Sequence, residues 1–144
     1  MKDETVIAVS GGFDPVHVGH VRMMKEAKKI GGKLVVILNN DNWLMKKKGF
    51  VFMPQAERKE IIENFWFVDQ VIVTKHKKGD EDYSVCRELK TLCPDVFANG
   101  GDRKPYNTAE VELCNIFGID MKFNVGGGKL QSSSDLVRNA KMFK

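Results

Sequence analysis

Residues 11–20 read GGFDPVHVGH, and this stretch decides the fold. The hydrophobic run at residues 5–9 before it is typical of a buried strand. Residues 21–30 after it have the spacing of an amphipathic helix that ends at Gly31 and Gly32. The stretch is therefore predicted to be a loop between a strand and a helix. Its two glycines let the backbone come close to a ligand.

The same alternation of strand and helix continues along the chain. Apolar runs typical of strands occupy residues 6–10, 34–38, 70–73, 95–99 and 121–125. Helical patterns cover residues 18–30, 54–64, 82–93 and 106–117, and a last helix is expected after Ser132. This order predicts an α/β, Rossmann-like three-layer fold, in which a five-stranded parallel sheet carries helices on both faces. With 144 residues, the chain is expected to form a single domain, residues 1–144.

Charge and hydropathy exclude several classes of protein. The chain has 23 basic and 19 acidic residues, a net charge of +4. A nucleic-acid-binding surface usually carries a stronger and more clustered excess, so no nucleic-acid partner is expected. The mild excess suits an anionic small molecule such as a phosphate. No stretch resembles a signal peptide or approaches the roughly 20 apolar residues of a membrane span, which predicts a cytoplasmic protein without a membrane partner.

The three cysteines, Cys86, Cys93 and Cys114, form no CxxC pair and no zinc-ligand spacing. Cys86 and Cys93 are seven residues apart in a helical pattern, so we expect both on one buried face. Structural thiols of this kind are typical of a reducing compartment.

Every unusual cluster of residues directly follows a predicted strand. The clusters are residues 11–20, 39–48, 99–103 and 126–134. In parallel α/β sheets, ligands bind at the carboxyl ends of the strands, beside the point where the strand order reverses. The sequence therefore predicts one site at this edge of the sheet.

The two histidines of the first cluster suit an anionic ligand. A helix that begins near them offers free amides and a favourable dipole, and His17 and His20, three apart, project to the same side. Both imidazoles can donate hydrogen bonds to phosphate oxygens as these gain charge. Metal ligation by the pair is less favoured because His76 stands apart in a lysine-rich loop, and two unrelated surface histidines remain the other alternative. Neither a GxGxxG nor a GK[ST] pattern is present, which disfavours a dinucleotide site and a Walker A loop.

The HxGH pattern in this stretch resembles the signature of the nucleotidyltransferase superfamily that includes the cytidylyltransferases. Four further segments look like counterparts in the same order: KKKGFVFMPQAERKEII (46–62), VDQVIV (68–73), PDVFANGGDRKP (94–105) and SSSDLV (132–137). The likeness covers nearly the whole chain. It is greatest to the adenylyltransferase domain of bacterial heptose-phosphate enzymes, and glycerol-3-phosphate cytidylyltransferases are similar over the same regions.

The resemblance implies transfer of a nucleoside monophosphate from ATP or CTP to a phosphorylated small-molecule acceptor, with release of pyrophosphate and without a covalent intermediate. Catalysis would rest on positioning and charge stabilisation. Adenylylation of a heptose-type sugar 1-phosphate is the first expectation. The alternatives are cytidylylation of glycerol 3-phosphate or another polyol phosphate, an FAD-synthase-like adenylyltransferase, and a nucleotide-binding regulator without turnover. The resemblance also implies Mg²⁺ bridging the phosphates with few protein ligands, and a homodimer, which an apolar surface at residues 65–67 would suit.

The resemblance assigns roles to individual residues. The implied catalytic residues are His17, His20 and Lys48. The implied nucleotide-binding residues are Gly11, Gly12, Phe13, Asp14, Gly19, Lys46, Asn99, Gly100, Gly101, Asp102, Ser132, Ser133 and Ser134. Asp41 and Arg58 are implied to bind the acceptor, and no residue is assigned as a protein metal ligand.

Plainer interpretations of the same residues remain open. Lysines 46–48 and Arg58 can be ordinary surface residues, residues 99–102 a strand-ending turn, and residues 132–135 a helix N-cap. Asp14 can serve only to order its loop. Trp43 and Trp66 can stack on a base or sugar, but packing in the core or in an interface is the first expectation for both.

The chain departs from the family pattern at several positions. Gly12 stands where Thr or Val is frequent, and Ser-Ser-Ser replaces Ser-Thr-Thr. Arg103 stands where the heptose enzymes tend to have an aromatic residue. GGGKLQ (126–131) replaces the Arg-Thr-Glu-Gly of glycerol-phosphate cytidylyltransferases, which weighs against cytidine and glycerol phosphate. Without a sugar-kinase domain, the chain is expected to be a stand-alone transferase.

Overall fold

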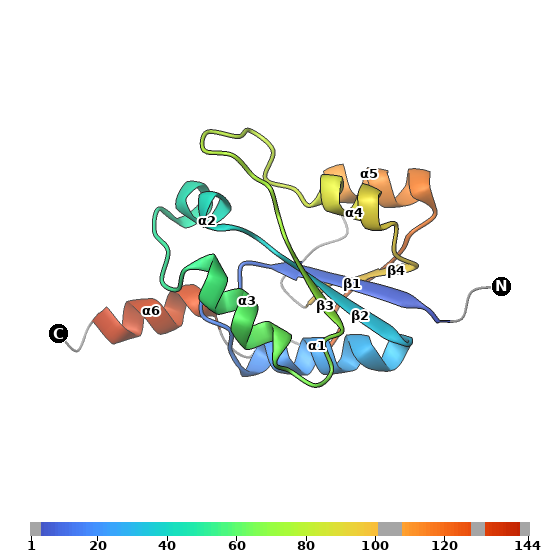
Figure 1. Cartoon of the computed structure of the whole chain (residues 1–144), viewed down its shortest axis with the longest axis horizontal. Helices are drawn as coiled ribbons and strands as arrows, with labels where there is room; N and C mark the ends of the chain where they lie inside the picture. The colour runs from blue at the N-terminus through green and yellow to red at the C-terminus, as the bar shows by residue number, and fades with distance from the viewer. Residues whose placement is uncertain (1–3, 101–107, 128–131, 142–144) are drawn as a thin grey trace.

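The fold is a parallel sheet between two layers of helices (Figure 1). The computed structural model describes residues 4–100, 108–127 and 132–141. The strands are β1 (Val6–Gly11), β2 (Lys33–Leu38), β3 (Gln70–Val73), β4 (Val96–Ala98) and β5 (Asp120–Lys122). The helices are α1 (Val18–Ile30), α2 (Asp41–Lys48), α3 (Gln55–Glu63), α4 (Cys86–Leu92), α5 (Thr108–Phe117) and α6 (Ser133–Lys141). The predicted Rossmann-like α/β class is confirmed.

The strand order is β3-β2-β1-β4-β5, and every pairing is parallel. β1 and β2 lie at the centre because their Val, Ile and Leu residues are buried on both faces of the sheet. The chain moves outward from β1 to β3 and then crosses back to β4 on the other side of β1. The strand order therefore reverses at β1, and the carboxyl end of such a strand is where ligands bind in sheets of this kind.

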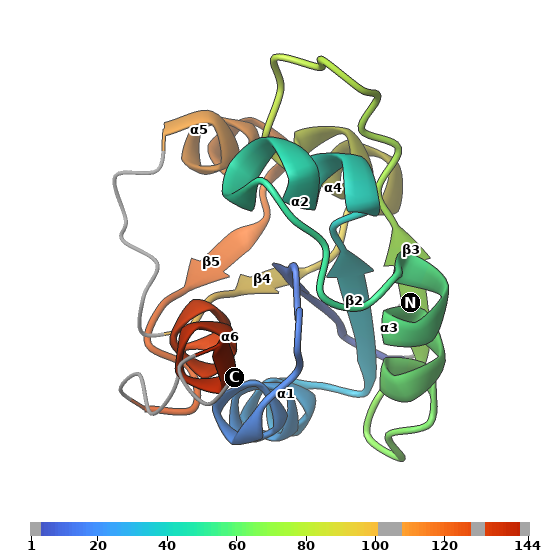
Figure 2. The same cartoon turned by 90° about the vertical axis from the view of Figure 1, so that its left-hand side faces the viewer.

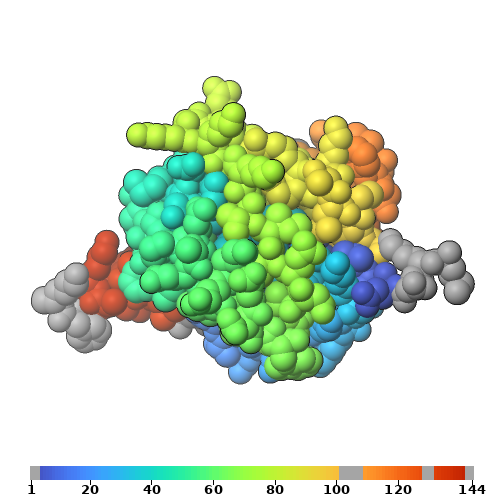
Figure 3. All heavy atoms as spheres, viewed as in Figure 1, coloured from blue at the N-terminus to red at the C-terminus, as the bar shows by residue number. Residues whose placement is uncertain are grey.

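Figure 2 shows the layers of helices on the two faces of the sheet, and two hydrophobic cores hold these layers together. One face of the sheet packs against α1 and α3 through residues such as Met24 and Ile62. The other face packs against α4 and α5 through Leu89 and Cys114. At the end to which the strands point, α2 and α6 are added outside these layers (Figure 1). In the space-filling view, α2, α3 and the segment after β3 form one continuous face, and α6 projects beyond it (Figure 3).

The helix α2 is absent from the sequence-based assignment, which treats residues 39–48 as a cluster after a strand. Only Leu44 is buried in this helix, so no apolar stripe signals it. Hydrogen bonds and backbone conformation at its two ends stabilise this helix instead. The Asn40 side chain accepts a hydrogen bond from the Trp43 amide, and Gly49 ends the helix in the left-handed conformation at φ 81°.

The cysteine prediction is wrong in part. Cys93 is exposed and ends α4 at φ 46°, so it does not share a buried face with Cys86, which is half-buried. Cys114 is the buried thiol, and burial, followed by the charge of Glu110, raises its pKa to about 11.

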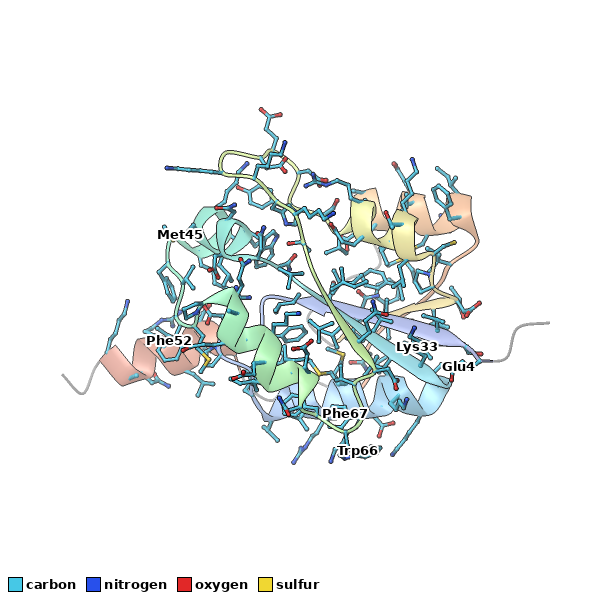
Figure 4. The ribbon with its side chains drawn as sticks, viewed as in Figure 1. Glu4, Lys33, Met45, Phe52, Trp66 and Phe67 are labelled. Carbon is cyan, nitrogen blue, oxygen red and sulfur yellow. The ribbon has the colours of Figure 1, made fainter. Side chains whose placement is uncertain are left out.

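The expectation for Trp66 is also wrong as far as the core is concerned, because its side chain is 79% exposed (Figure 4). Its neighbour Phe67 is buried and Phe65 is half-buried, so the expected apolar surface at residues 65–67 reduces to one indole. His76 is buried at 3% exposure, where its Nε2–H donates to the Ser84 carbonyl at 2.9 Å and its Nδ1 accepts from the Thr74 hydroxyl at 2.8 Å. None of the helices in the described part of the chain is long and apolar enough to cross a membrane.

Candidate active site

The two histidines of the HxGH stretch form a reciprocal cap at the start of α1. His17 is the N-cap residue, and its Nδ1 accepts a hydrogen bond from the Gly19 amide at 3.1 Å. The Nδ1 of His20 accepts from the His17 amide at 3.1 Å. The two rings stack with their centroids 3.6 Å apart and their planes 22° apart. The arrangement is a capping box in which imidazoles replace the usual hydroxyl and carboxamide.

This cap fixes which ring nitrogen can donate. Because each Nδ1 accepts a backbone N–H, the proton of each neutral ring lies on Nε2. The pKa of His20 falls from 6.5 to about 3, first because the ring is buried and then because of the charges of His17 and Lys48. His20 is therefore a neutral Nε2–H donor. The site residue Phe13, held at φ 50°, packs edge-on against the His20 ring at 4.8 Å.

The start of α6 meets the same loop. The Ser133 hydroxyl donates to the Pro15 carbonyl at 2.7 Å, and the Asp135 amide donates to the Ser132 hydroxyl at 3.3 Å. Two helix N-termini, each with free amides and the positive end of its dipole, thus lie beside one loop. The Ser133 hydroxyl is committed to this junction, and Ser132 is the N-cap of α6. Ser134 follows in the first turn and is half-buried.

The lysines in the last turn of α2 divide between the site and the loop at residues 75–85. Lys48 lies close enough to His20 for its charge to lower the pKa of that ring. Lys46 instead contacts the Asp80 carbonyl, and its ammonium lies 4.6 Å from the centre of the Tyr83 ring. The structure therefore directs Lys46 away from the histidines, in contrast to its expected place among the nucleotide-binding residues.

Asp14 orders its loop, which is the plainer of its two interpretations. It is 1% exposed, and its carboxylate accepts hydrogen bonds from the amides of Phe52 at 2.7 Å and Met53 at 2.6 Å. These bonds tie the segment after α2 to the loop that carries the histidines. Direct contact between this carboxylate and a nucleotide does not fit its burial.

Arg58 is expected at the acceptor, but the structure places it in the interior at 1% exposure. Its Nε donates to the Met53 carbonyl at 2.9 Å, and its Nη1 donates to the Gly12 and Asn39 carbonyls, both at 2.7 Å. Its Nη2 pairs with the Asp41 carboxylate at 2.7 Å. Arg58 and Asp41 therefore form a brace that holds the ends of β1 and β2. The burial of Arg58 does not fit direct contact with an acceptor, whereas the carboxylate of Asp41 is partly exposed and its place at the acceptor stays a prediction.

Gly12 has a physical reason for departing from the family pattern. A Cβ at this position would lie 3.0 Å from Leu44 Cδ2 and 3.2 Å from Trp43 Cζ3. The neighbouring Gly11 accepts the Asn39 amide hydrogen bond at 2.9 Å, and a Cβ there would lie 2.9 Å from the Phe13 ring. Both glycines give room for close packing of α2 and Phe13 on the loop.

The expected nucleobase loop is described only in part. Asn99 is buried, and its Nδ2 donates to the Phe97 and Lys122 carbonyls, both at 3.2 Å. Gly100 follows and is half-buried. Gly101 and Asp102, like Arg103, lie outside the described residues.

Two functional candidates beside α2, Asn39 and Asn40, escape the sequence-based assignment of roles. Asn40 caps α2, and Asn39 is buried with a side-chain oxygen that has no hydrogen-bond partner among the described residues. Trp43, for which packing is the first expectation, packs on Gly12. The available signal is a pair of asparagines directly after the apolar run at residues 34–38. Within residues 4–100, 108–127 and 132–141, no group of three or more His, Cys, Asp or Glu side chains is arranged to hold a metal ion.

Comparison with known proteins agrees with this geometry. A family model described as cytidylyltransferase-like matches residues 8–118. An FAD synthase from Pyrococcus horikoshii is 36% identical over 98 residues, which are 67% of this chain and 63% of that protein. The bifunctional protein HldE from Syntrophotalea carbinolica is 32% identical over 119 residues, which are 81% of this chain and 23% of that protein.

Two solved structures share the fold. A lipopolysaccharide core biosynthesis protein from Thermoplasma volcanium superposes with a TM-score of 0.63 at 27% identity, over 83% of this chain and 93% of that one. A pantoate-beta-alanine ligase from Francisella tularensis gives 0.65 at 17% identity, over 95% of this chain and 66% of that one, which shows the fold alone. The matched residues span less than two thirds of the curated relatives, 63% of the FAD synthase and 23% of HldE. With its strand order, its capped histidine pair and this family match, the chain belongs to the cytidylyltransferase-like family.

Proposed function

We propose that this chain transfers an adenylyl group from ATP to the phosphate of a small acceptor and releases pyrophosphate. The observation that carries the proposal is the histidine pair, whose two Nε2–H donors stand where the N-termini of α1 and α6 meet. That arrangement offers donors and positive dipole ends to a chain of phosphates. The similarity to FAD synthase and HldE supports the same chemistry.

The reaction needs positioning rather than a covalent intermediate. An oxygen of the acceptor phosphate attacks the α-phosphorus of ATP, the bond from that phosphorus to the bridging oxygen breaks, and pyrophosphate leaves with the electron pair. His17 and His20 donate hydrogen bonds to the α-phosphate oxygens as these gain charge, and Lys48 adds a positive charge beside them. A donor of this kind contributes roughly 3 kcal/mol to the transition state.

The amides at the start of α6 are the proposed site for the β- and γ-phosphates. Mg²⁺ would neutralise charge on the phosphates, held by them and by water with few protein ligands.

Two acceptors have a specific observation in their favour. A heptose-type sugar 1-phosphate is favoured by the HldE relative, which matches 81% of this chain. FMN is favoured by the FAD synthase relative, which matches at the higher identity of 36%. Both acceptors present a phosphate oxygen as the nucleophile, so the site is the same for either. Cytidylylation of a polyol phosphate is the remaining enzymatic alternative.

A pyrophosphate-release screen tests the proposal. ATP, CTP, GTP and UTP are each combined with Mg²⁺ and with heptose 1-phosphate, FMN, glycerol 3-phosphate or no acceptor. Release that requires both ATP and one of the first two acceptors is the expected result. Release with CTP and glycerol 3-phosphate would replace adenylyl by cytidylyl transfer. Nucleotide binding without release under any combination would leave a binding protein and refute the proposed transfer.

A further inference from the structure

Trp43 is held rigidly against the loop of the site. It lies in the first turn of α2, where its amide donates to Asn40 Oδ1 at 3.0 Å and its indole Nε1–H donates to the Tyr83 carbonyl at 2.9 Å. The benzo edge of the ring faces Gly12, and a Cβ on Gly12 would lie 3.2 Å from Cζ3. The indole thus occupies the space that a side chain at position 12 would take. Figure 2 shows α2 lying over the carboxyl end of β1, where this contact occurs.

Asn39 lies beside the same loop, and its side-chain oxygen lacks a hydrogen-bond donor among the described residues. It is 4% exposed, and its Oδ1 has no hydrogen-bond partner. Its backbone is fixed, because its amide donates to the Gly11 carbonyl at 2.9 Å and its carbonyl accepts from Arg58 at 2.7 Å. A buried carbonyl oxygen without a donor is costly to a folded protein. No residue within the described ranges donates to this oxygen, which makes it available to a donor on a bound ligand.

Arg58 links the backbone at Gly12, on which Trp43 packs, to the backbone at Asn39. One nitrogen, Nη1, binds both the Gly12 and the Asn39 carbonyls at 2.7 Å, so the ends of β1 and β2 lie side by side. Trp43 packs on Gly12 from the side of α2. The Arg58 guanidinium is thereby committed to the frame, with Asp41 at the partly exposed end of the pair, and Asn39 and Trp43 lie at the same corner.

We propose that Trp43 and Asn39 line the subsite for the acceptor and select a ring that carries hydrogen-bond donors. The proposal rests on the adenylyl transfer proposed above. The indole packs against the ring, and Asn39 Oδ1 accepts a hydrogen bond from a ring hydroxyl or ring N–H after its amide turns toward the ligand. Sugars and flavins share this chemistry, so the test includes both. A buried water that satisfies Asn39 Oδ1 is the competing explanation for that oxygen.

The kinetic test separates acceptor binding from nucleotide binding. Trp43→Ala and Asn39→Ala are each expected to raise the acceptor KM by about tenfold, with the ATP KM changed less than about threefold. Trp43→Phe keeps an aromatic face and should recover most of the loss. Trp66→Ala removes the exposed indole at the other end of the sheet and should leave both constants unchanged. Equal KM values in the Trp43→Ala and wild-type proteins, or a rise in the ATP KM alone, would overturn the subsite.

A binding test does not depend on turnover. In a Trp66→Phe protein Trp43 is the sole indole, and its quenching by acrylamide is measured with and without FMN or heptose 1-phosphate. A bound acceptor ring is expected to shield Trp43 and to lower the acrylamide quenching constant at least twofold relative to the free protein. In the Asn39→Ala variant, the acceptor concentration that gives half of this protection should rise by about tenfold.

The two tests keep the proposals apart. Turnover with an unshielded Trp43 would leave the adenylyl transfer standing and overturn the subsite. Shielding without turnover would support the subsite and overturn the transfer. Absence of both would overturn both. Asn39→Ala could also bind the acceptor as tightly as the parent protein while Trp43→Ala does not. In that case Asn39 Oδ1 is satisfied by a buried water, and the proposed role of Asn39 is wrong.

Discussion

The Ser133 hydroxyl donates a hydrogen bond to the Pro15 carbonyl at 2.7 Å across 118 positions of sequence. It joins the first turn of α6 to the loop that positions His17. The site therefore has two halves, one from each end of the described chain, and this bond links them.

Ser133→Ala should lower the free energy of unfolding by about 1–2 kcal/mol, because the half-buried Pro15 carbonyl loses its partner. The KM for ATP should rise as well, since the two helix ends are no longer tied. Urea unfolding and pyrophosphate release measure the two effects. Thr91→Ala serves as the matched control, because it deletes an exposed helical hydroxyl that bonds only to the Arg87 carbonyl, and it should change neither.

His17→Asn separates capping from chemistry. Asparagine is a good N-cap residue, so the helix start should keep its stability to within about 1 kcal/mol. The imidazole donor is lost, and kcat should fall by about 10²–10³-fold, as it does when one transition-state donor is removed. Thermal melting and initial rates give the comparison. A variant that keeps near-normal kcat would show that His17 only caps α1.

The depressed pKa of His20 makes folding depend on pH. The unfolded ring takes up a proton below pH 6.5, whereas the folded ring stays neutral down to about pH 3. Its contribution to stability is therefore complete above pH 6.5 and declines as the pH falls, by up to about 1.4 kcal/mol per pH unit. His20→Gln keeps the reciprocal cap without titrating. Urea midpoints of wild type and variant should converge as the pH is lowered from 7 to 4, and parallel curves would refute the assignment.

Arg58→Lys tests whether the buried guanidinium is a brace or an acceptor ligand. Lysine cannot replace four hydrogen bonds to three carbonyls and a carboxylate, and a broken buried pair costs about 3–5 kcal/mol. We expect a loss of that order in the free energy of unfolding. Asp41→Asn, at the partly exposed end of the pair, should cost less. Intact stability with a raised acceptor KM would instead restore the role implied by the sequence.

Gly126 and Gly127 form a matched pair for testing how the β5–α6 connection sits on α1. Both have positive φ, 84° and 85°, so alanine strains either backbone by about 1 kcal/mol. Only at Gly126 would the added Cβ meet a neighbour, at 2.7 Å from Met23 Cα and 2.9 Å from Met23 N. Gly126→Ala should therefore destabilise the protein by at least about 1 kcal/mol more than Gly127→Ala in denaturant titrations. Equal effects would show that the loop moves freely away from α1.

The sequence predicts the sheet and the histidine pair well, because both depend on local signals. Apolar runs of β-branched residues locate β1 to β3, and the Gly-Gly and HxGH spacing locates the loop and the start of α1. The local sequence does not predict which residues a side chain contacts. A surface arginine on a helix and one buried beneath two strand ends have the same local sequence, so the burial of Arg58 depends on a tertiary contact with Gly12.

The same limitation explains the missed helix and the misplaced lysine. The helix α2 is held by caps and by contacts with residues 75–85, not by an apolar stripe that a hydrophobic pattern can reveal. Lys46 turns toward Tyr83 because the two segments lie together in space, 37 positions apart in sequence. The resemblance to a family transfers the role of a residue type, whereas the direction of a long side chain is set by its neighbours.

Because β1 lies at the centre of the sheet, the strands that pair on its two sides become available at different times during synthesis on the ribosome. Strands β2 and β3 are added to one side of β1 as soon as they emerge, whereas β4 must wait for nearly ninety further residues, from Ile7 to its partner Val96. The second helix terminus at the site arrives last of all, with Ser133. A nascent chain can thus bury most of its apolar core before α6, whose first amides are the proposed site for the β- and γ-phosphates, has been synthesised.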